Sequence, residues 1–539
     1  MEPIALNQHW QLFLDDHACS RVTGFDRVVH RPRPCGVVLP ADRPWETAGI
    51  GLDFVDRRED GSFLAFYRAM WWDAGIAQAR ESDSEDLAHH VSSAMAYATS
   101  EDGIHWSKPD LGLLEAPAGV DGSCAPYPQP KGSSTRNNLG APFSFIQDLG
   151  RYGNVCDPQK RYAVRLDPQE TCAICANWQY SSHGYFLDAL PDFPKGVGWR
   201  ERLVDSGGAF NPRRHTLHFW DEIHDEWVAM EQGVIGHWLP SREIARMASG
   251  DLIAWTSDAA LYPDAADPHT PQCYDEPMSL TPFCAEGVVF GLLSWFHSDR
   301  SHPDGGPNPE PSEAHPHRWP WCRKGTNEMR ITLSRDGGKT WDRTSSREAW
   351  VPHGTEHDSY DRMVIGAVPP VRVGEEDWFY MSVMDGDHLA IRNNSGQTPY
   401  YADRLRRGQI ARYTQKHNRY VSLRANNARE ILITKPIVIA GDSLYVNVDA
   451  SRGQFRVGIA LAEPVGTQKD QATPSAAPHL LEHHMIAGFT FDDCEPVSVN
   501  SIEHRVQFGN GDTLASLREK PVRLFFEVFD ADLYGFRAV

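Results

Sequence analysis

Short runs of alternating apolar and polar residues, separated by turn residues, cover most of the chain. The stretch GIGLDFVDRREDGSFLAFYRAMW from Gly49 is an example, with two aromatic-rich runs around the polar turn DRREDGS. This period-2 pattern is typical of a β-hairpin. Four similar hairpins are expected to start near Phe143, Gly207, Met278 and Ile365. Helical periodicity is nearly absent, and residues 241–247 are the best short helix candidate.

A Ser–Asp–Trp cluster recurs between the hairpins. It reads SEDGIHW at 100–106, SGDLIAW at 249–255 and SRDGGKTW at 334–341. Ser and Asp side chains bond to nearby backbone N–H groups, and Gly supplies positive φ, so the cluster closes a hairpin turn. We therefore predict that Asp102, Asp251 and Asp336 hold turns and take no part in catalysis.

Repeated hairpins with turn staples predict an all-β fold. Five units, each an inner hairpin followed by an outer hairpin, indicate a five-bladed β-propeller over residues 1–405. Beyond that point the staple is absent, and strands such as ILITKPIVI and VRLFFEVFDADLYGF follow one another at regular spacing. Residues 406–539 are therefore expected to form a C-terminal antiparallel β-sandwich.

The net charge and the composition of the chain limit the classes of molecule that it is expected to bind. The formal net charge of −21 disfavours nucleic acid and anionic membranes, which bind Lys and Arg. No run of about 18 apolar residues occurs, and the N-terminus lacks a signal-peptide pattern, so we expect a cytoplasmic protein. The C-x-x-C at 172–175 has no second pair at metal spacing, and the His-rich stretch 302–317 is a weak ligand set. No metal or cofactor is expected; homo-oligomer formation stays open.

Acidic residues flank the predicted inner strands, whose ends should converge on a central funnel. Glycoside hydrolysis generally requires two carboxyl groups, one as acid and one as base or nucleophile. We predict Glu276 as the general acid, because a Glu before an apolar strand can be partly desolvated. Asp205 and Asp361 are the predicted base-or-nucleophile and pKa-tuning pair, with the order of roles open. The remaining flanking acids are Glu46, Asp53, Asp148, Asp275 and Asp358.

Sugar rings offer apolar faces and hydroxyl groups, which aromatic and polar side chains bind. The substrate-binding candidates are the aromatic, basic and acidic residues beside the inner hairpins: Trp45, Glu46, Asp53, His297, Arg362 and His388.

Several of these stretches resemble known families. SRDGGKTW resembles the Asp-box (BNR repeat) of sialidases, and five blades before a sandwich resemble glycoside hydrolase families 32 and 43. LFLDDH (12–17), PWE (44–46) and SYDRM (359–363) are similar to a set of bacterial glycosyl hydrolase sequences. The W-x-N-D-P motif that holds the family 32 nucleophile is absent. The resemblance implies carbohydrate metabolism, with an oligosaccharide or glycoside as substrate.

We therefore expect an O-glycosyl hydrolase with a carboxylate pair in the propeller funnel. Two alternatives remain open. Many propellers only bind, so the chain could be a carbohydrate-binding module without catalysis. A polysaccharide lyase would need a His or Tyr base and a cationic clamp, and the funnel flanks hold more acids than arginines.

Overall fold

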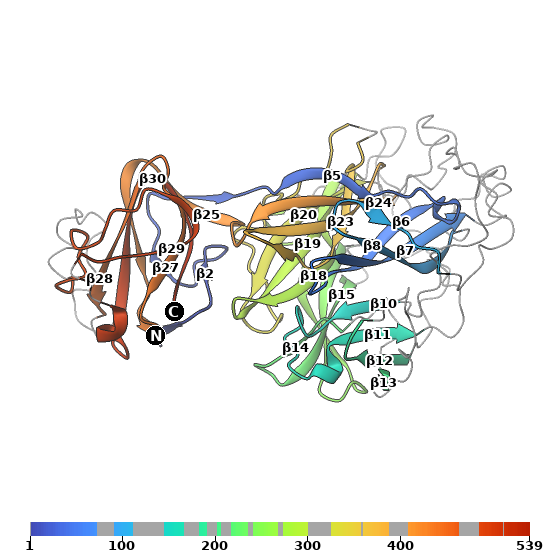
Figure 1. The fold of residues 1–539 in the computed structure, drawn as a ribbon, viewed down its shortest axis with the longest axis horizontal. Helices are drawn as coiled ribbons and strands as arrows, with labels where there is room; N and C mark the ends of the chain where they lie inside the picture. The colour runs from blue at the N-terminus through green and yellow to red at the C-terminus, as the bar shows by residue number, and fades with distance from the viewer. Residues whose placement is uncertain are drawn as a thin grey trace.

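The computed structural model describes residues 2–72, 91–111, 145–166, 183–190, 202–205, 217–235, 241–267, 273–299, 325–356, 359–386, 408–462, 485–509, 511 and 513–539. Their regular structure is all-β apart from short 3₁₀ turns such as Pro44–Glu46 (Figure 1). Within these residues, no helix has the length and apolar character needed to span a bilayer.

The described strands between residues 33 and 416 form five groups. The first is β6 (Gly49–Arg57), β7 (Phe63–Trp72), β8 (Val91–Ser100) and β9 (Trp106–Ser107). The second is β10 (Phe145–Asp148), β11 (Tyr162–Leu166), β12 (His183–Leu187) and β13 (Val204–Asp205). The third is β14 (Phe219–Asp221), β15 (Glu226–Ile235), β16 (Ser241–Ser249) and β17 (Thr256–Leu261).

The last two groups continue the same antiparallel pattern. The fourth is β18 (Cys273–Ala285), β19 (Val288–Asp299) and β20 (Gly325–Ser334). The fifth is β21 (Met363–Ala367), β22 (Val371–Val373), β23 (Glu376–Met384) and β24 (Gly408–Lys416), joined by β5 (Arg33–Leu39) from near the N-terminus. The hairpins predicted near Gly49, Phe143, Met278 and Ile365 are present, whereas most of the one predicted from Gly207 lies outside the described residues. The helix expected at 241–247 is wrong, because these residues lie in β16, paired on both sides by β15 and β17.

Each group packs on the next, and the fifth packs on the first. Strand β6 contacts β10, and Phe186 contacts Trp227 between the second and third groups with ring centroids 5.5 Å apart. Strand β18 then contacts β14 and β21. Between the fifth and first groups, Gly408 pairs with Gly49, where a Cβ would lie 2.2 Å from the backbone nitrogen of Gly408. Gly49 also has φ +101°, so this contact requires glycine.

Tyr152, on the turn between β10 and β11, links the second group to two others. Its hydroxyl donates to the carbonyl of Pro370 in the fifth group at 2.7 Å. Its carbonyl accepts from the amide of Cys284 in the fourth group at 2.7 Å. Burial raises the pKa of the phenol well above its ordinary value, so the hydroxyl remains a hydrogen-bond donor.

The residues on either side of Tyr152 reach the two remaining groups. The Arg151 guanidinium binds Asp56, at the end of β6, at 2.9 Å. The Gly153 carbonyl accepts from the amide of Trp220 in the third group at 2.8 Å. Residues 151–153 therefore contact all four other groups, and we call them the hub.

The two ends of the strand groups differ. The hub lies at the end where β6 meets β7 and β18 meets β19 through short turns, which we call the turn end. At the opposite end, which we call the loop end, β7 ends at Trp72, β19 at Asp299 and β23 at Met384, and the next strands begin only at Val91, Gly325 and Gly408. Long connections in compact domains are often functional, so the loop end is where a site is expected.

The Ser–Asp–Trp clusters close turns at the turn end, as predicted. Asp102 Oδ1 accepts from the amides of Ile104 and His105, both at 2.8 Å. Asp251 Oδ1 makes the same pair of bonds to the amides two and three residues on, also at 2.8 Å. Asp336 Oδ1 accepts from the Thr340 amide at 2.9 Å.

The C-terminal residues form a ten-stranded sheet, drawn in orange and red in Figure 1. Its strands are β25 (Val421–Thr434), β26 (Ile437–Ile439), β27 (Leu444–Asp449), β28 (Gln454–Leu461), β29 (Asn500–Arg505) and β30 (Pro521–Ala538), with the N-terminal strands β1 (Ile4–Leu6), β2 (Gln11–Leu12), β3 (Cys19–Arg21) and β4 (Asp26–Val29). Pairing thus crosses the boundary expected at residue 405 in both directions, because β1–β4 join this sheet and β24 joins the fifth group.

We predict that Asp336→Ala lowers the free energy of unfolding by about 1 kcal/mol, because the turn loses its side-chain acceptor. Urea unfolding followed by tryptophan fluorescence measures the change. Asp492→Ala is the control, since that side chain is 89% exposed and its ion pair is on the surface. Equal stability of the Asp336 variant and the wild type would contradict the staple role.

We predict that Tyr152→Phe destabilises the chain by about 1–3 kcal/mol, because the half-buried Pro370 carbonyl loses the donor that the buried tyrosine supplies. The matched control is Tyr262→Phe, whose ring is 51% exposed. Both variants should be compared in the same thermal and urea unfolding experiments. An equal effect of the two substitutions would show that the hub hydrogen bond contributes nothing to stability.

Candidate active site

The loop end of the fourth group holds a charged network on three adjacent strands. Asp275 of β18 lies opposite His297 of β19 in the strand register, with its Oδ1 2.9 Å from Nδ1 of the imidazole. Oε2 of Glu328, on β20, lies 3.0 Å from Nε2 of the same ring. Arg330 donates through Nε to Oε1 of Glu328 at 2.7 Å. We call these four residues the Asp–His–Glu–Arg network.

Contacts within the network, more than burial, set the protonation states of His297 and Glu328. Asp275 is 3% and Glu328 7% exposed. Burial would lower the pKa of His297, but its contacts with Asp275 and Glu328 outweigh this and raise the pKa to about 9. Burial would likewise raise the pKa of Glu328, yet the imidazolium and Arg330 lower it. Near neutral pH the network therefore contains an imidazolium beside an ionised glutamate.

Trp295 supports this network from the core. The ring is fully buried, and two guanidinium groups lie over it, with Arg330 4.5 Å and Arg343 4.4 Å from its centroid. Arg343 is itself fixed by two 2.7 Å bonds to Asp267. These cation–π contacts position Arg330 toward Glu328, and they leave no ring face for a sugar.

Two predicted residues, Asp361 and Arg362, lie in a turn next to the network. The Arg362 guanidinium donates to the Gly354 carbonyl at 3.0 Å, and the Asp361 carboxylate accepts from the Ser359 hydroxyl. Gly354 follows His353, whose ring centroid is 6.0 Å from that of His297. The structure thus brings predicted residues Asp361, Arg362 and His297 into one neighbourhood.

The predicted catalytic trio is not assembled by the described residues. Glu276 is 1% exposed and binds Arg242 through the backbone amide at 2.8 Å and through Nη1 at 2.5 Å. Consecutive strand residues point to opposite faces, so Glu276 cannot share the partner of Asp275. Asp205 is exposed on β13, the last strand of its sheet. Nothing in the described structure places these two carboxyl groups with Asp361 in one pocket.

The predicted residues of the first group have structural partners. Glu46 is 1% exposed and accepts from Lys108 Nζ at 2.7 Å and from the Tyr67 hydroxyl at 2.8 Å. Trp45 is buried in a hydrophobic core that also contains Tyr67. Asp53 binds Arg68 at 2.8 Å. His388 and the His-rich stretch 302–317 lie outside the described residues.

Glu328 and Arg330 are not among the candidate site residues predicted from the sequence, although their spacing in the sequence could have identified them. Both lie in GTNEMRITLS, the strand β20, whose ten residues are all buried. Two opposite charges two residues apart on a buried strand point to the same face. Such a pair implies a buried ion network, since a lone buried charge is costly.

One other acidic group resembles a metal site. Ligand atoms of Asp221, His224 and Glu226 lie within 4.8 Å of one another. However, the Arg246 guanidinium already binds Asp221 at 2.7 Å and Glu226 at 2.8 Å. Because this cation supplies the positive charge that a metal would bring, the group does not fit a metal ion.

Solved structures of similar fold exist, but sequence comparison does not assign the chain to a family. No family model and no curated protein matches the sequence. A solved structure described as a glycoside hydrolase is 10% identical, covers 72% of this chain and 92% of its own, and has a TM-score of 0.37. A β-1,2-mannobiose phosphorylase from Listeria innocua is 12% identical, with coverage of 73% and 91% and a TM-score of 0.36.

A glycosyl hydrolase from Bacteroides ovatus is also 12% identical, covers 77% of this chain and 95% of its own, and has a TM-score of 0.35. These three structures are thus described as two glycoside hydrolases and one phosphorylase. At these identities and TM-scores the similarity does not identify an activity.

The pKa of His297 predicts a pH-dependent stability. Its folded pKa of about 9 exceeds the ordinary 6.5, so the stabilisation is complete below pH 6.5 and is lost as pH rises through about 9. His297→Gln should reduce this loss, as measured by urea unfolding at several pH values. His9→Gln, in the loop between β1 and β2, should keep the wild-type slope. The same slope in the His297 variant would contradict the assignment.

Proposed function

We propose that the chain is a glycoside hydrolase built on a five-bladed β-propeller, with its active site at the loop end. The five strand groups contact one another in sequence, and the fifth pairs with the first. The hub fills the turn end with hydrogen bonds to every group. A substrate would therefore approach from the loop end, where the Asp–His–Glu–Arg network and the Asp361 turn lie.

The observation that carries this proposal is the buried Glu328 carboxylate, which lies 3.0 Å from the His297 ring nitrogen and 2.7 Å from Arg330, two groups that lower its pKa. Cleavage of a glycosidic bond passes through an oxocarbenium-like state, whose positive charge a fixed carboxylate stabilises. In the proposed reaction Glu328 accepts the proton of the attacking water. Asp361 is the proposed acid, which protonates the leaving oxygen as the glycosidic bond breaks. Arg362 is the proposed substrate-binding residue beside it.

The network weighs against the two alternatives. A lyase with a histidine base needs that histidine neutral, but His297 has a pKa of about 9 and both its ring nitrogens contact carboxylates, so a lyase would have to use a tyrosine. A purely binding propeller has no need for buried ionised groups, which cost solvation free energy. The cytoplasmic location and the carbohydrate partner stay predictions.

We predict that Glu328→Gln lowers the kcat of the folded fraction on a cleaved glycoside at least 100-fold, because it removes the base. It should also lower the melting temperature, because His297 and Arg330 lose a buried ionised partner. Glu276→Gln is the matched control. It weakens a buried ion pair with Arg242, so it should lower the melting temperature while the folded fraction keeps near-normal kcat. Reducing-sugar release from a panel of oligosaccharides and nitrophenyl glycosides supplies the measurement.

Two results would overturn the proposal. If Glu276→Gln abolishes turnover while Glu328→Gln does not, the network is structural and the acid predicted from the sequence is restored. If the wild type cleaves nothing in the panel but binds oligosaccharides in calorimetry, the binding-module alternative replaces hydrolysis.

A further inference from the structure

Strand β17 (Thr256–Leu261) forms an exposed edge of the third group. It is the last strand in the order β14–β15–β16–β17, and it pairs on one side with β16. Its first four residues, 256–259, are all exposed. The backbone N–H and C=O groups that do not bond to β16 therefore face outward, and no hydrogen bond from them to another strand is present among the described residues.

The outer edges of the other four groups are shorter or covered. The last strands of the first and second groups, β9 and β13, have two residues each. In the fourth group, Met329 and Leu333 of β20 bridge to Val351 and Asp342. In the fifth group, β5 pairs with β24. Among the described strands of the five groups, β17 is therefore the longest exposed outer edge.

The sequence of β17, TSDAAL, lacks the residues that commonly protect an edge strand. Natural edges are blunted by Lys, Pro or bulges, which prevent pairing with a second chain. Strand β17 contains no Lys and no Pro, and Asp258 is its single charged residue. The register shift relative to β16 begins only after Ala259, so residues 256–259 keep regular strand pairing. This part of the edge has the geometry to accept one more strand.

Two large apolar side chains lie at the ends of this edge. Ile253, in the turn before β17, is 70% exposed, and Tyr262, directly after β17, is 51% exposed. Antiparallel pairing places the start of one strand beside the end of its partner. In a pair of β17 strands from two copies of the chain, Ile253 of each copy would therefore approach Tyr262 of the other, and both would lose exposed apolar area.

The charges beside the edge are balanced, although the chain as a whole is acidic, with a formal net charge of −21. Asp264 and Asp267, which follow β17, are paired with Arg347 at 2.5 Å and with Arg343 at 2.7 Å. Repulsion between like charges opposes the self-association of an acidic chain. A locally balanced surface is therefore where two copies can meet at the lowest electrostatic cost.

The sequence of β17 also determines how two copies would pair. A two-fold antiparallel pair is symmetric about one central residue. Centred on Ser257, the pair places Thr256 of each copy opposite Asp258 of the other, so a hydroxyl group faces a carboxylate. Centred on Asp258, it would place two carboxylates opposite each other, which is destabilising. Ser257 is therefore the expected centre.

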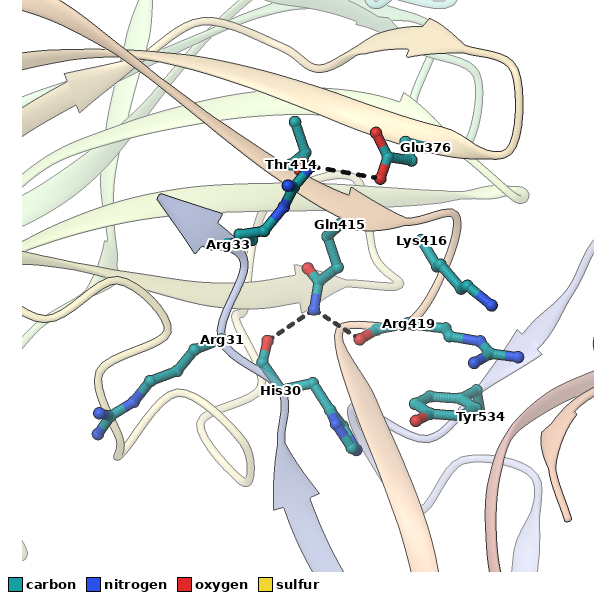
Figure 2. Close-up of a pocket in the computed structure, with 9 residues that line it drawn as sticks. All are labelled: His30, Arg31, Arg33, Glu376, Thr414, Gln415, Lys416, Arg419 and Tyr534. Atoms are coloured by element: carbon teal, nitrogen blue, oxygen red, sulfur yellow. Dashed lines mark hydrogen bonds and ion pairs between the residues drawn. The ribbon is translucent and has the colours of Figure 1, made fainter. Parts of the chain in front are cut away.

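A cavity of about 250 Å³ beside β24 is a weaker candidate for a binding site (Figure 2). Arg31, Arg33 and Lys416 line it, but Figure 2 shows their side chains pointing in different directions. Arg33 also lies 3.9 Å from Glu376. Because these cations do not converge on one ligand, the cavity is a poorer interaction site than the edge of β17.

We propose that the chain forms a homodimer through antiparallel pairing of β17 with β17 of a second copy. The two four-stranded sheets of the third groups become one sheet of eight strands across the two-fold axis. Backbone hydrogen bonds fix the geometry of the contact, and Ile253 and Tyr262 supply its apolar burial.

The first test is sedimentation equilibrium of the full chain over a range of concentrations. We expect the mass to rise from that of one chain to that of two chains. Ser257→Lys places two ammonium groups opposite each other at the axis and should weaken dimerisation by about tenfold or more. Ser516→Lys is the matched control, because it adds the same charge at an exposed position of the turn Leu514–Leu517, far along the chain, and should dimerise like the wild type.

A mixing experiment separates the proposed contact from a loss of fold. Ser257→Asp should also weaken dimerisation, because two carboxylates then face each other at the axis. An equimolar mixture of Ser257→Lys and Ser257→Asp should dimerise again, because opposite charges meet there. A misfolded variant would not be restored by mixing.

Three results would overturn the proposal. A wild type that is monomeric at every concentration would leave the edge of β17 to a strand from a different protein. A dimer that Ser257→Lys does not weaken would use another surface of the chain. A mixture of the two Ser257 variants that stays monomeric would exclude the pairing centred on Ser257. None of these measurements depends on glycoside cleavage.

Discussion

The contacts among the five strand groups depend on the hub, residues 151–153, which lies in the second group and bonds to each of the others. Buried backbone groups need hydrogen-bond partners, and the hub supplies them across group boundaries. Tyr152 alone joins two other groups, through its hydroxyl and its carbonyl. Two acids beside the hub lose solvation free energy. Burial raises the pKa of Asp148 to about 6 and also raises the pKa of Asp56. Arg151 offsets part of that cost by pairing with Asp56.

The buried acids at the loop end divide into two kinds. Glu46 and Glu276 each have a cation and further donors, Lys108 in one case and Arg242 in the other, and such closed pairs hold segments together. The Asp–His–Glu–Arg network instead places two carboxylates on one imidazole. This arrangement is expensive to bury and is not needed to join strands that already pair along their length. Its cost is the physical reason to regard it as functional.

Local features of the fold could be predicted from the sequence, because their causes lie within a few residues. Asp102 and Asp251 accept hydrogen bonds from amides two and three residues further along the chain. The residues that close each of these turns are therefore all found within one short stretch of sequence. By contrast, the pairing of β1 with β26 joins residues 4–6 to residues 437–439, and no pattern within either segment predicts this pairing. The strand at 241–247 shows the same limit, since its two paired neighbours override a helix-compatible composition.

The choice between Asp275 and Glu276 shows why the site was only partly predictable. The sequence places both acids before an apolar strand, but the pleat sends them to opposite faces, and a register shift follows between Pro277 and Ser279. Their partners, His297 and Arg242, come from different strand groups, so the role of each acid depends on tertiary packing. The residue types alone therefore predicted that the loop end is acidic. The strand register determines that Glu276 forms a separate ion pair with Arg242 and that Asp275 belongs to the Asp–His–Glu–Arg network.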